Sequence, residues 1–292
     1  MGLRVARMTA RYAVITGAAR GLGQHLAFRF WEAGYSLGLI GRNAASLDET
    51  RSRLSRSEAR KCDVFACDLS EPALVQNLVA EICATAGQIN VLINNAAIQG
   101  PIGPLQQNDL GDWERTIRVN LTTPVVMCRG LLPRMARAPE ASILNLSGGG
   151  ATAPRANFSA YASAKTALVR FSETLADEVR EQGVTVNCIA PGAMKTAMLG
   201  EVLRRGADGS GRREFAIAAK VFGEGGASMD RVADLAIFLA SPAARDITGK
   251  LISAVWDRWE CWPDHITELA SSDLYTLRRI AGRDRGCGWG DL

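Results

Sequence analysis

The sequence predicts a single α/β domain in which helices cover both faces of a doubly wound parallel sheet of about seven strands. Two observations support this fold class. Short apolar segments alternate with helical segments of roughly ten to fifteen residues, which is typical of strands joined by crossover helices. The first apolar segment also runs directly into a glycine-rich turn that opens a helix, as at the ligand-binding edge of such sheets.

The elements follow one another along the chain with recognisable boundaries. Strands are expected over residues 12–16, 35–40, 63–67, 89–93, 141–147, 184–190 and 247–255, each a short apolar run. Helices are expected over residues 24–33, 71–84, 112–136, 161–180 and 230–240, where apolar positions recur at helical spacing. Gly34 ends the first helix, Pro72 opens the second, and Pro124 is expected to interrupt the third.

Length and composition favour one large domain over two small ones. The chain has 292 residues, of which 47% are hydrophobic, and this is enough for a sizeable core. We expect a main, ligand-binding domain over residues 1–255 and a C-terminal extension over residues 256–292. Because Trp256, Trp259 and Trp262 bury large surfaces, the extension should pack on the body or on a partner subunit.

Charge and cysteine usage exclude several function classes. A net charge of +4 with scattered arginines argues against a dedicated nucleic-acid surface. Seven cysteines without a CxxC pair fit neither a disulfide framework nor a zinc site, and they indicate a reducing compartment. Residues 1–9 lack the apolar core of a signal peptide, and no later apolar run approaches the ~18 residues of a membrane span. We therefore expect a cytoplasmic protein that binds no metal, nucleic acid or membrane.

The glycine turn after the first strand is the first candidate binding site. Its spacing is GxxxGxG, which differs from the commoner GxGxxG. Glycines let the backbone turn tightly and approach a pyrophosphate, and the free N–H groups of a helix N-terminus favour the anion. The candidate dinucleotide-binding residues are Gly17, Arg20, Gly21, Leu22 and Gly23. The alternative is a turn that merely opens a helix.

Two arginines indicate which dinucleotide would bind. After the second strand the chain continues with Gly41 and Arg42, at a point where an acid would bond to the adenosine ribose and an arginine accommodates a 2′-phosphate. Arg42 and Arg20 are both placed to meet a phosphate. They predict NADP(H) in preference to NAD(H), and the alternative is that both are solvated surface residues.

Polar residues follow the third and fourth strands, at the edge where parallel sheets bind ligands. Asp68 and Leu69 follow the third strand, and Asn95 and Ala96 follow the fourth. All four are candidate cofactor-binding residues.

Tyr161 and Lys165 form the candidate catalytic pair. Four positions apart on a helix, their heads lie on one face. A phenol has a pKa near ~10, and an ammonium about 4 Å away in a partly dry site can lower that pKa by roughly three units. The phenol would then serve as an acid and base. The spacing alone is weak evidence, because such pairs are common on helix surfaces.

Three motifs, taken together and in this order, resemble the short-chain dehydrogenase/reductase family. They are TGxxxGxG at residues 16–23, an NNAG-like segment at 94–97 and YxxxK at 161–165, and the resemblance spans roughly residues 10–255. It implies a single Rossmann-like domain, a nicotinamide cofactor and hydride transfer between a carbonyl and an alcohol. Tyr161 would be the proton donor or acceptor, and Lys165 would lower its pKa and bind the nicotinamide ribose. Ala97 stands where the family has glycine, and its methyl group should narrow the approach slightly.

The resemblance implies further roles. Asp68 would lie near the adenine and Asn95 near the cofactor ribose. Asn120 would kink its helix and hold a water that links the lysine to solvent, the alternative being a helix-interior asparagine bonded to backbone. The loop that resembles PGxxxT would hold the nicotinamide carboxamide, and its matching residues are Pro191, Gly192, Met194 and Thr196.

The chain departs from the family at the catalytic serine. That serine normally stands thirteen residues before the tyrosine, which is Gly148 here, and Ser147 is one position early. On a strand, a shift of one residue points a side chain to the opposite face. Three interpretations stay open: N–H groups of residues 148–150 stabilise the oxyanion, a bend swings Ser147 inward, or the protein is no longer a good reductase. We favour the first, because glycines can form anion-binding concavities.

Two segments bear on substrate and assembly. Residues 197–226 are rich in glycine and charge, which suits a mobile lid over the substrate. This segment carries four arginines, which are Arg204, Arg205, Arg212 and Arg213. They would either contact an anionic group of the substrate or, as we favour, form a solvated basic helix face. An apolar stripe on the helix of the catalytic pair fits a dimer interface, as in the family, or ordinary packing on the sheet; it consists of Leu168, Phe171 and Leu175.

Together these observations predict an NADP(H)-dependent oxidoreductase that interconverts a carbonyl and a secondary alcohol on a small molecule. We expect it to be a homodimer or homotetramer. Two alternatives stay open: a cofactor-binding protein with a regulatory or structural role, and an epimerase or isomerase that uses the cofactor transiently.

Overall fold

The structure is a computed structural model that describes residues 11–136, 138, 140–287 and 289. The N-terminal segment 1–9, for which we predicted the absence of a signal peptide, lies outside the described residues. Within them, no helix combines the length and the apolar character needed to cross a membrane.

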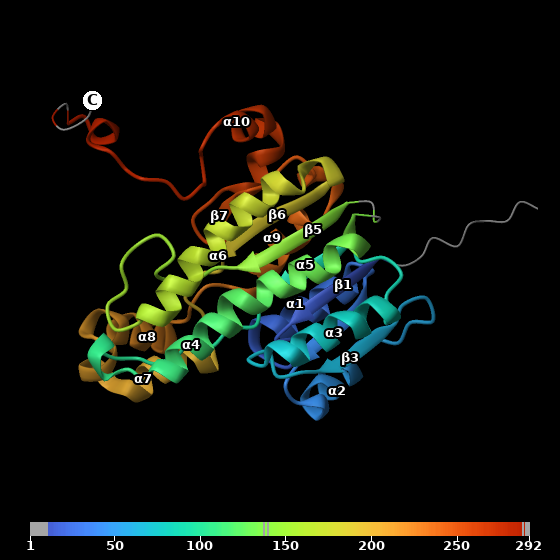
Figure 1. The fold of residues 1–292 in the computed structure, drawn as a ribbon, viewed down its shortest axis with the longest axis horizontal. Coiled ribbons are helices and arrows are strands. Elements are labelled where there is room, and N and C mark those ends of the chain that lie inside the picture. Colours follow the sequence, from blue (N-terminus) through green and yellow to red (C-terminus); the bar gives the residue numbers. More distant parts are fainter. Residues whose placement is uncertain (1–10, 137, 139, 288, 290–292) are drawn as a thin grey trace, which may run out of the picture.

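Seven parallel strands form one sheet in the order β3-β2-β1-β4-β5-β6-β7 (Figure 1). The strands are β1 (Tyr12–Thr16), β2 (Ser36–Gly41), β3 (Cys62–Ala66), β4 (Val91–Asn94), β5 (Ala141–Leu146), β6 (Val184–Ala190) and β7 (Leu251–Ser253). The strand order reverses between β1 and β4, where ligands bind in this architecture. The predicted fold class is confirmed.

Helices cover both faces of this sheet. On one face α1 (Gly21–Glu32), α2 (Ala44–Ser52) and α9 (Met229–Leu239) pack into one apolar core. On the other face α3 (Pro72–Thr85), α5 (Thr123–Met135) and α6 (Ser159–Glu178) pack into a second core and lie in front of the sheet in Figure 1. Leu168 and Leu175 of the predicted interface stripe are buried within the chain itself, so ordinary packing accounts for both.

The predicted long helix over 112–136 is broken, but not at Pro124. It consists of α4 (Leu110–Ile117), a π-helical turn (Arg118–Thr122) and α5. Pro124 lies in the first turn of α5, where proline is tolerated. A π turn widens the helix locally and is frequent at functional sites, and this one contains Asn120.

The glycine-rich lid segment is helical. It forms α7 (Ala197–Ser210) and α8 (Arg212–Glu224), which pack on each other. Gly206 interrupts α7 with φ +70°, and Gly211 joins the two helices with φ +87°. Both conformations favour glycine, so the glycines mark the bends of a folded helical pair. Short helical turns elsewhere span Leu105–Gln107, Arg180–Gln182, Pro242–Ala244 and Gly282–Arg285.

The C-terminal extension packs on the body through two of its tryptophans. The turn Trp259–His265 precedes α10 (Ile266–Ser271), and Trp259 and Trp262 are buried in the same core as α9. The chain then passes β7, where the Leu251 N–H donates to the Tyr275 carbonyl at 2.8 Å. The Leu277 N–H then donates to Glu173 of α6 at 2.6 Å, and the red segment beyond it leaves the body (Figure 1).

Candidate active site

The end of β1 is joined to the end of β4 by one threonine. The Thr16 hydroxyl oxygen accepts the backbone N–H groups of Asn95 and Ala96 at 2.9 and 3.0 Å. The Asn95 side chain in turn donates to the Thr16 carbonyl at 2.9 Å. These bonds fix the glycine turn against the segment that follows β4, so the predicted cofactor residues of both strands meet at one edge.

The glycine turn is packed too closely for side chains. Gly17 has φ +70°, and a Cβ on Gly23 would lie 2.1 Å from the Gly17 carbonyl oxygen. Leu22 between them is buried in the core below α1, whereas Arg20 precedes that helix and is exposed. The turn therefore holds the N-terminus of α1 against β1 and leaves its free N–H groups available to an anion.

Arg20 and Arg42 line one cavity of about 560 Å³, and their contact with a phosphate stays a prediction. Arg115 of α4 and Arg205 of α7 line the same cavity. Both arginines that the sequence selected are exposed. The cavity wall thus offers four guanidinium groups, which suit a phosphorylated ligand, beside the carboxylates of Asp109, Asp112 and Glu201.

Asp68 is held ionised at the adjoining strand end. The backbone N–H and hydroxyl of Ser70 donate to its Oδ1 at 2.9 and 2.8 Å. These bonds, together with the charges of Arg115 and Arg42, keep the pKa of Asp68 below its ordinary value. Leu69 is buried, and its carbonyl accepts the Thr123 hydroxyl at 2.7 Å. The β3 end is thereby fixed beside the π turn.

Asn120 clamps the backbone that follows β4. Its Oδ1 accepts the Ile98 N–H at 2.9 Å and its Nδ2 donates to the Ile98 carbonyl at 2.8 Å. Asn120 is fully buried within the π turn. Both polar atoms of its side-chain amide are therefore bonded to the Ile98 backbone. This agrees with the alternative of an asparagine inside a helix that is bonded to backbone. Its predicted part in a proton relay stays a prediction.

Tyr161 and Lys165 lie together on α6 and are both buried, at 7% and 2% exposure. The Lys165 Nζ lies 5.8 Å from the centroid of the Tyr161 ring and donates to the Leu146 carbonyl, at the end of β5, at 2.6 Å. Burial lowers the pKa of Lys165 to about 8. Burial raises the pKa of the Tyr161 phenol, and the charge of Arg155 opposes that rise. The lowering of this pKa by Lys165 stays a prediction.

Gly148 leaves room for the tyrosine hydroxyl. A Cβ at this position would lie 2.3 Å from the Tyr161 Oη. The position of the family's serine is therefore filled by the phenol itself. The Ser147 hydroxyl is buried and has no hydrogen-bond partner among the described residues, so it does not bond to Tyr161. The structure gives no support to a Ser147 that is swung in toward the phenol.

The loop from Pro191 to Thr196 follows β6 at the same edge of the sheet. Gly192 has φ +78°, and Met194 is buried. The Thr196 hydroxyl caps α7 by accepting the Leu199 N–H at 3.3 Å, which leaves its own O–H free to donate. This loop therefore connects the candidate nicotinamide contacts directly to the lid.

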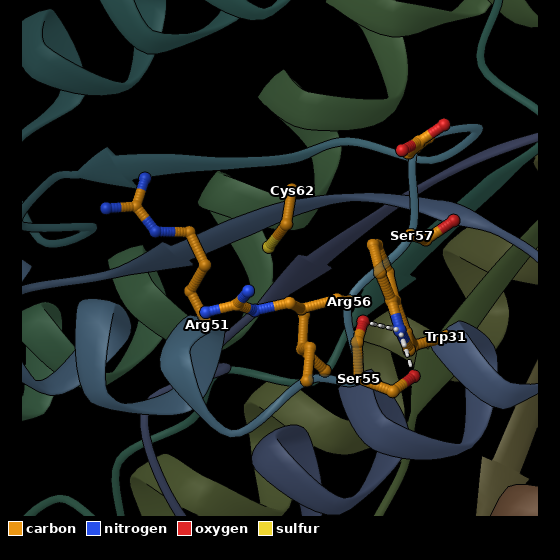
Figure 2. Close-up of a pocket in the computed structure, with 8 residues that line it drawn as sticks. Trp31, Arg51, Ser55, Arg56, Ser57 and Cys62 are labelled. Atoms are coloured by element: carbon orange, nitrogen blue, oxygen red, sulfur yellow. Dashed lines mark hydrogen bonds between the residues drawn. The ribbon is translucent and has the colours of Figure 1, made fainter.

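A second cavity, of about 660 Å³, lies away from this edge (Figure 2). It is bordered by Trp31, whose indole N–H bonds to Ser55, and by Arg51, Arg56 and Cys62. None of the predicted site residues lines it. Among the described residues, no cluster of three or more histidine, cysteine, aspartate or glutamate side chains could hold a metal ion.

Comparison with known proteins agrees with this geometry. A family model described as short chain dehydrogenase matches residues 11–206. The chain belongs to the short-chain dehydrogenase family. This family comprises oxidoreductases that typically act on alcohol and carbonyl groups.

Three similar proteins illustrate the match. D-threitol dehydrogenase of Mycolicibacterium smegmatis is 31% identical over 243 residues, 83% of this chain and 90% of that protein. A blue fluorescent protein from a metagenomic library, solved in complex with NADPH, is 27% identical with a TM-score of 0.70, over 85% of this chain and 97% of that one. A candidate NAD(P)-dependent gluconate 5-dehydrogenase of Beutenbergia cavernae, solved with NADP at low occupancy, is 28% identical with a TM-score of 0.72, over 85% and 96%.

In this short-chain dehydrogenase the segment predicted to be a lid shares one apolar cluster with the candidate acid. Tyr161 shares an apolar cluster with Ile102 of the loop after β4, Val202 of α7 and Ala218 of α8. Arg155, which touches both the lid and the tyrosine, was not selected from the sequence, because a lone loop arginine carries no pattern.

Replacing Lys165 by methionine should stabilise the protein. The folded chain releases the lysine proton near pH 8, whereas the unfolded chain holds it to about 10.5, so burial of the charge costs about 3 kcal/mol at pH 7. The unpaired Leu146 carbonyl in Lys165→Met offsets about 1 kcal/mol of that gain. Urea denaturation should show a variant more stable by about 2 kcal/mol at pH 7.

This advantage should disappear as the pH rises from 8 to about 10.5, since the wild-type lysine then loses its proton in both states. Lys220→Met, at an exposed position of α8, is the matched control and should show no such pH dependence. An advantage of Lys165→Met that is equal at pH 7 and pH 10 would contradict the assignment.

Replacing Gly148 by serine should impair turnover, although it restores the family's residue. The added Cβ would displace the Tyr161 hydroxyl, so kcat should fall at least roughly tenfold. Cofactor affinity, measured by NADPH fluorescence, should change little. The kcat of Gly148→Ala should fall as much as that of Gly148→Ser. Gly87→Ala, where a Cβ meets nothing within 4 Å, is the control and should keep the wild-type kcat. Higher activity in Gly148→Ser would show that the phenol is not confined by residue 148.

Proposed function

We propose that this protein is an NADP(H)-dependent oxidoreductase that interconverts a carbonyl and a secondary alcohol, with Tyr161 as the acid and base. One observation carries the proposal. A buried tyrosine and a buried lysine lie side by side under the lid. The glycine turn follows β1 and the PGxxxT-like loop follows β6, at the same edge of the sheet.

The chain's own residues have distinct parts in the reaction that we propose. The bound cofactor would supply or accept the hydride. In the reducing direction Tyr161 Oη gives its proton to the substrate oxygen, and the resulting phenolate is stabilised by the charges near it. Lys165 is held by the Leu146 carbonyl and would turn part of its hydrogen-bonding capacity to the ribose. The lid excludes water from the phenol through Val202 and Ala218.

The preference for NADP(H) rests on arginines and on the lack of an acid after β2. Arg20 and Arg42 face one cavity, so a 2′-phosphate there would meet two guanidinium groups. The similar structures solved with NADPH and with NADP are consistent with this choice. A role of Asp68 and Asn95 at the adenosine end belongs to the same proposal.

A small hydroxylated molecule is the substrate class that we propose, since D-threitol dehydrogenase is among the relatives. The residues of the lid and the loop that contact the phenol are apolar, so part of the substrate near the reacting carbon should be apolar too. A homodimer or homotetramer in the cytoplasm completes the proposal.

Tyr161→Phe should abolish turnover and leave NADPH affinity within about twofold, because the variant removes one hydroxyl and keeps the ring. The measurement is NADPH fluorescence titration, followed by absorbance at the nicotinamide band with a panel of ketones and polyols. Equal turnover in the variant would remove the proposed acid. Tight NADPH binding without consumption in the wild type would favour a regulatory protein, and conversion of substrate without net consumption would favour an epimerase.

Arg42→Ala should weaken NADPH binding by roughly tenfold or more and NADH binding by less than twofold, because only NADPH carries the 2′-phosphate. Arg245→Ala removes an exposed arginine remote from the cavity and serves as the control. A loss of the same size for both cofactors would overturn the assignment of Arg42.

A further inference from the structure

Arg155 is a largely enclosed arginine that has no part in the reaction proposed above. It lies in the loop between β5 and α6, seven residues after Gly148, and its side chain is only 12% exposed. Its Nε donates to Glu214 Oε2 at 2.8 Å, and Glu214 is itself 18% exposed, in the first turn of α8. An ion pair this enclosed joins the loop after β5 to the lid.

The same guanidinium lies against two aromatic rings. Its central carbon is 3.8 Å from the centroid of the Phe158 ring and 5.5 Å from that of Tyr161. Stacking of a guanidinium on a ring face is attractive and holds both groups in place. The arginine side chain also lies beside Gly149, where an added Cβ would be 3.9 Å from its Cδ and Nε, an ordinary contact.

We propose that Arg155 is a positioning residue for Tyr161: it fixes the phenol ring from the side opened by the glycines and stabilises its ionised form, while Glu214 regulates how much of the arginine's charge the phenol experiences. This inference rests on the proposed role of Tyr161 as acid and base. It assigns to an arginine part of the support that the family's serine would give.

The surroundings of the phenol favour this assignment. From its own helix it is faced by Lys165, which is tied to the Leu146 carbonyl. The phenol shares one apolar cluster with Ile102 of the loop after β4, Val202 of α7 and Ala218 of α8. Glu214 of α8 pairs with Arg155 of the loop after β5. Burial raises the pKa of Tyr161 and the charge of Arg155 lowers it, so the arginine is a principal opposing influence.

The ion pair makes opposite predictions for its two partners. Arg155→Met removes the positive charge, so the Tyr161 phenol should ionise at higher pH than in the wild type. Glu214→Gln removes the neutralising carboxylate and leaves the arginine charged, so the phenol should ionise at lower pH. If the pair were only a latch that holds the lid, both variants would break it and shift the ionisation in the same direction.

The experiment titrates Tyr161 directly in the full chain. The protein has four tyrosines, so subtraction of the Tyr161→Phe spectrum isolates the phenolate absorbance of one. Incorporation of 3-fluorotyrosine lowers the pKa of phenols and brings the titration into a range where the fold persists, which far-UV circular dichroism verifies. Arg155→Lys keeps the charge and should titrate near the wild type.

Opposite shifts in Arg155→Met and Glu214→Gln, with rescue by Arg155→Lys, are the expected result. Shifts in the same direction, or none, would overturn the proposal. If Arg155→Met fails to fold, Glu214→Gln decides alone: a shift to higher pH or no shift refutes it. If the enzyme is active, the pH at which kcat/KM rises or falls should shift in the same direction as the pKa of Tyr161 in each variant. The kcat of Arg155→Met at neutral pH should fall roughly tenfold.

The titration requires no turnover, so the two hypotheses fail separately. Absence of ketone reduction in the wild type would reject the proposed function and leave the charge coupling between Arg155 and Tyr161 measurable. Normal reduction with no shift in either variant would reject the coupling alone.

Discussion

Two backbone bonds to one hydroxyl hold the two halves of the site together. The Thr16 Oγ1 accepts from both residues that follow Asn94, and the Asn95 amide returns to Thr16, so the ends of β1 and β4 cannot separate. They are the strands at which the sheet reverses its order. A cofactor laid across this edge would contact a rigid turn on one side and, through the clamp that Asn120 places on Ile98, a rigid loop on the other.

The two groups that are proposed to act in the reaction, Tyr161 and Lys165, lower the folding stability of the protein when they are charged. Lys165 is buried beside a phenol and satisfied by a single backbone carbonyl, so its charge is expensive to keep. Tyr161 is likewise enclosed, and burial opposes its ionised form. The helix α6 thus carries two groups whose charged forms its surroundings disfavour. Such opposition between stability and activity is expected where a protein holds acid and base chemistry in a dry site.

Much of this arrangement follows from sequence pattern. Buried parallel strands are nearly continuous apolar runs, so all seven were found to within a few residues, and the motifs indicated the edge of the sheet at which the candidate site residues gather. Helix α2 was missed because its cap, Asn43, precedes few apolar residues. The break in the helix was expected at Pro124, and only the family resemblance indicated a kink at Asn120, because backbone widening leaves no compositional trace. Arg155 and Arg115 were missed for another reason: each acquires its partner, Glu214 or Asp68, only through tertiary folding.

The bond between Leu251 and Tyr275 has a consequence for assembly. A strand at the end of a sheet offers unpaired N–H and C=O groups to any neighbour, which favours growth of the sheet from one molecule into the next. Here the chain's own tail occupies that edge, and the Lys250 ammonium fastens it by donating to the Ser272 and Leu274 carbonyls at 3.2 and 3.0 Å. The sheet is therefore terminated from within, and two copies that associate must do so without merging their sheets along β7.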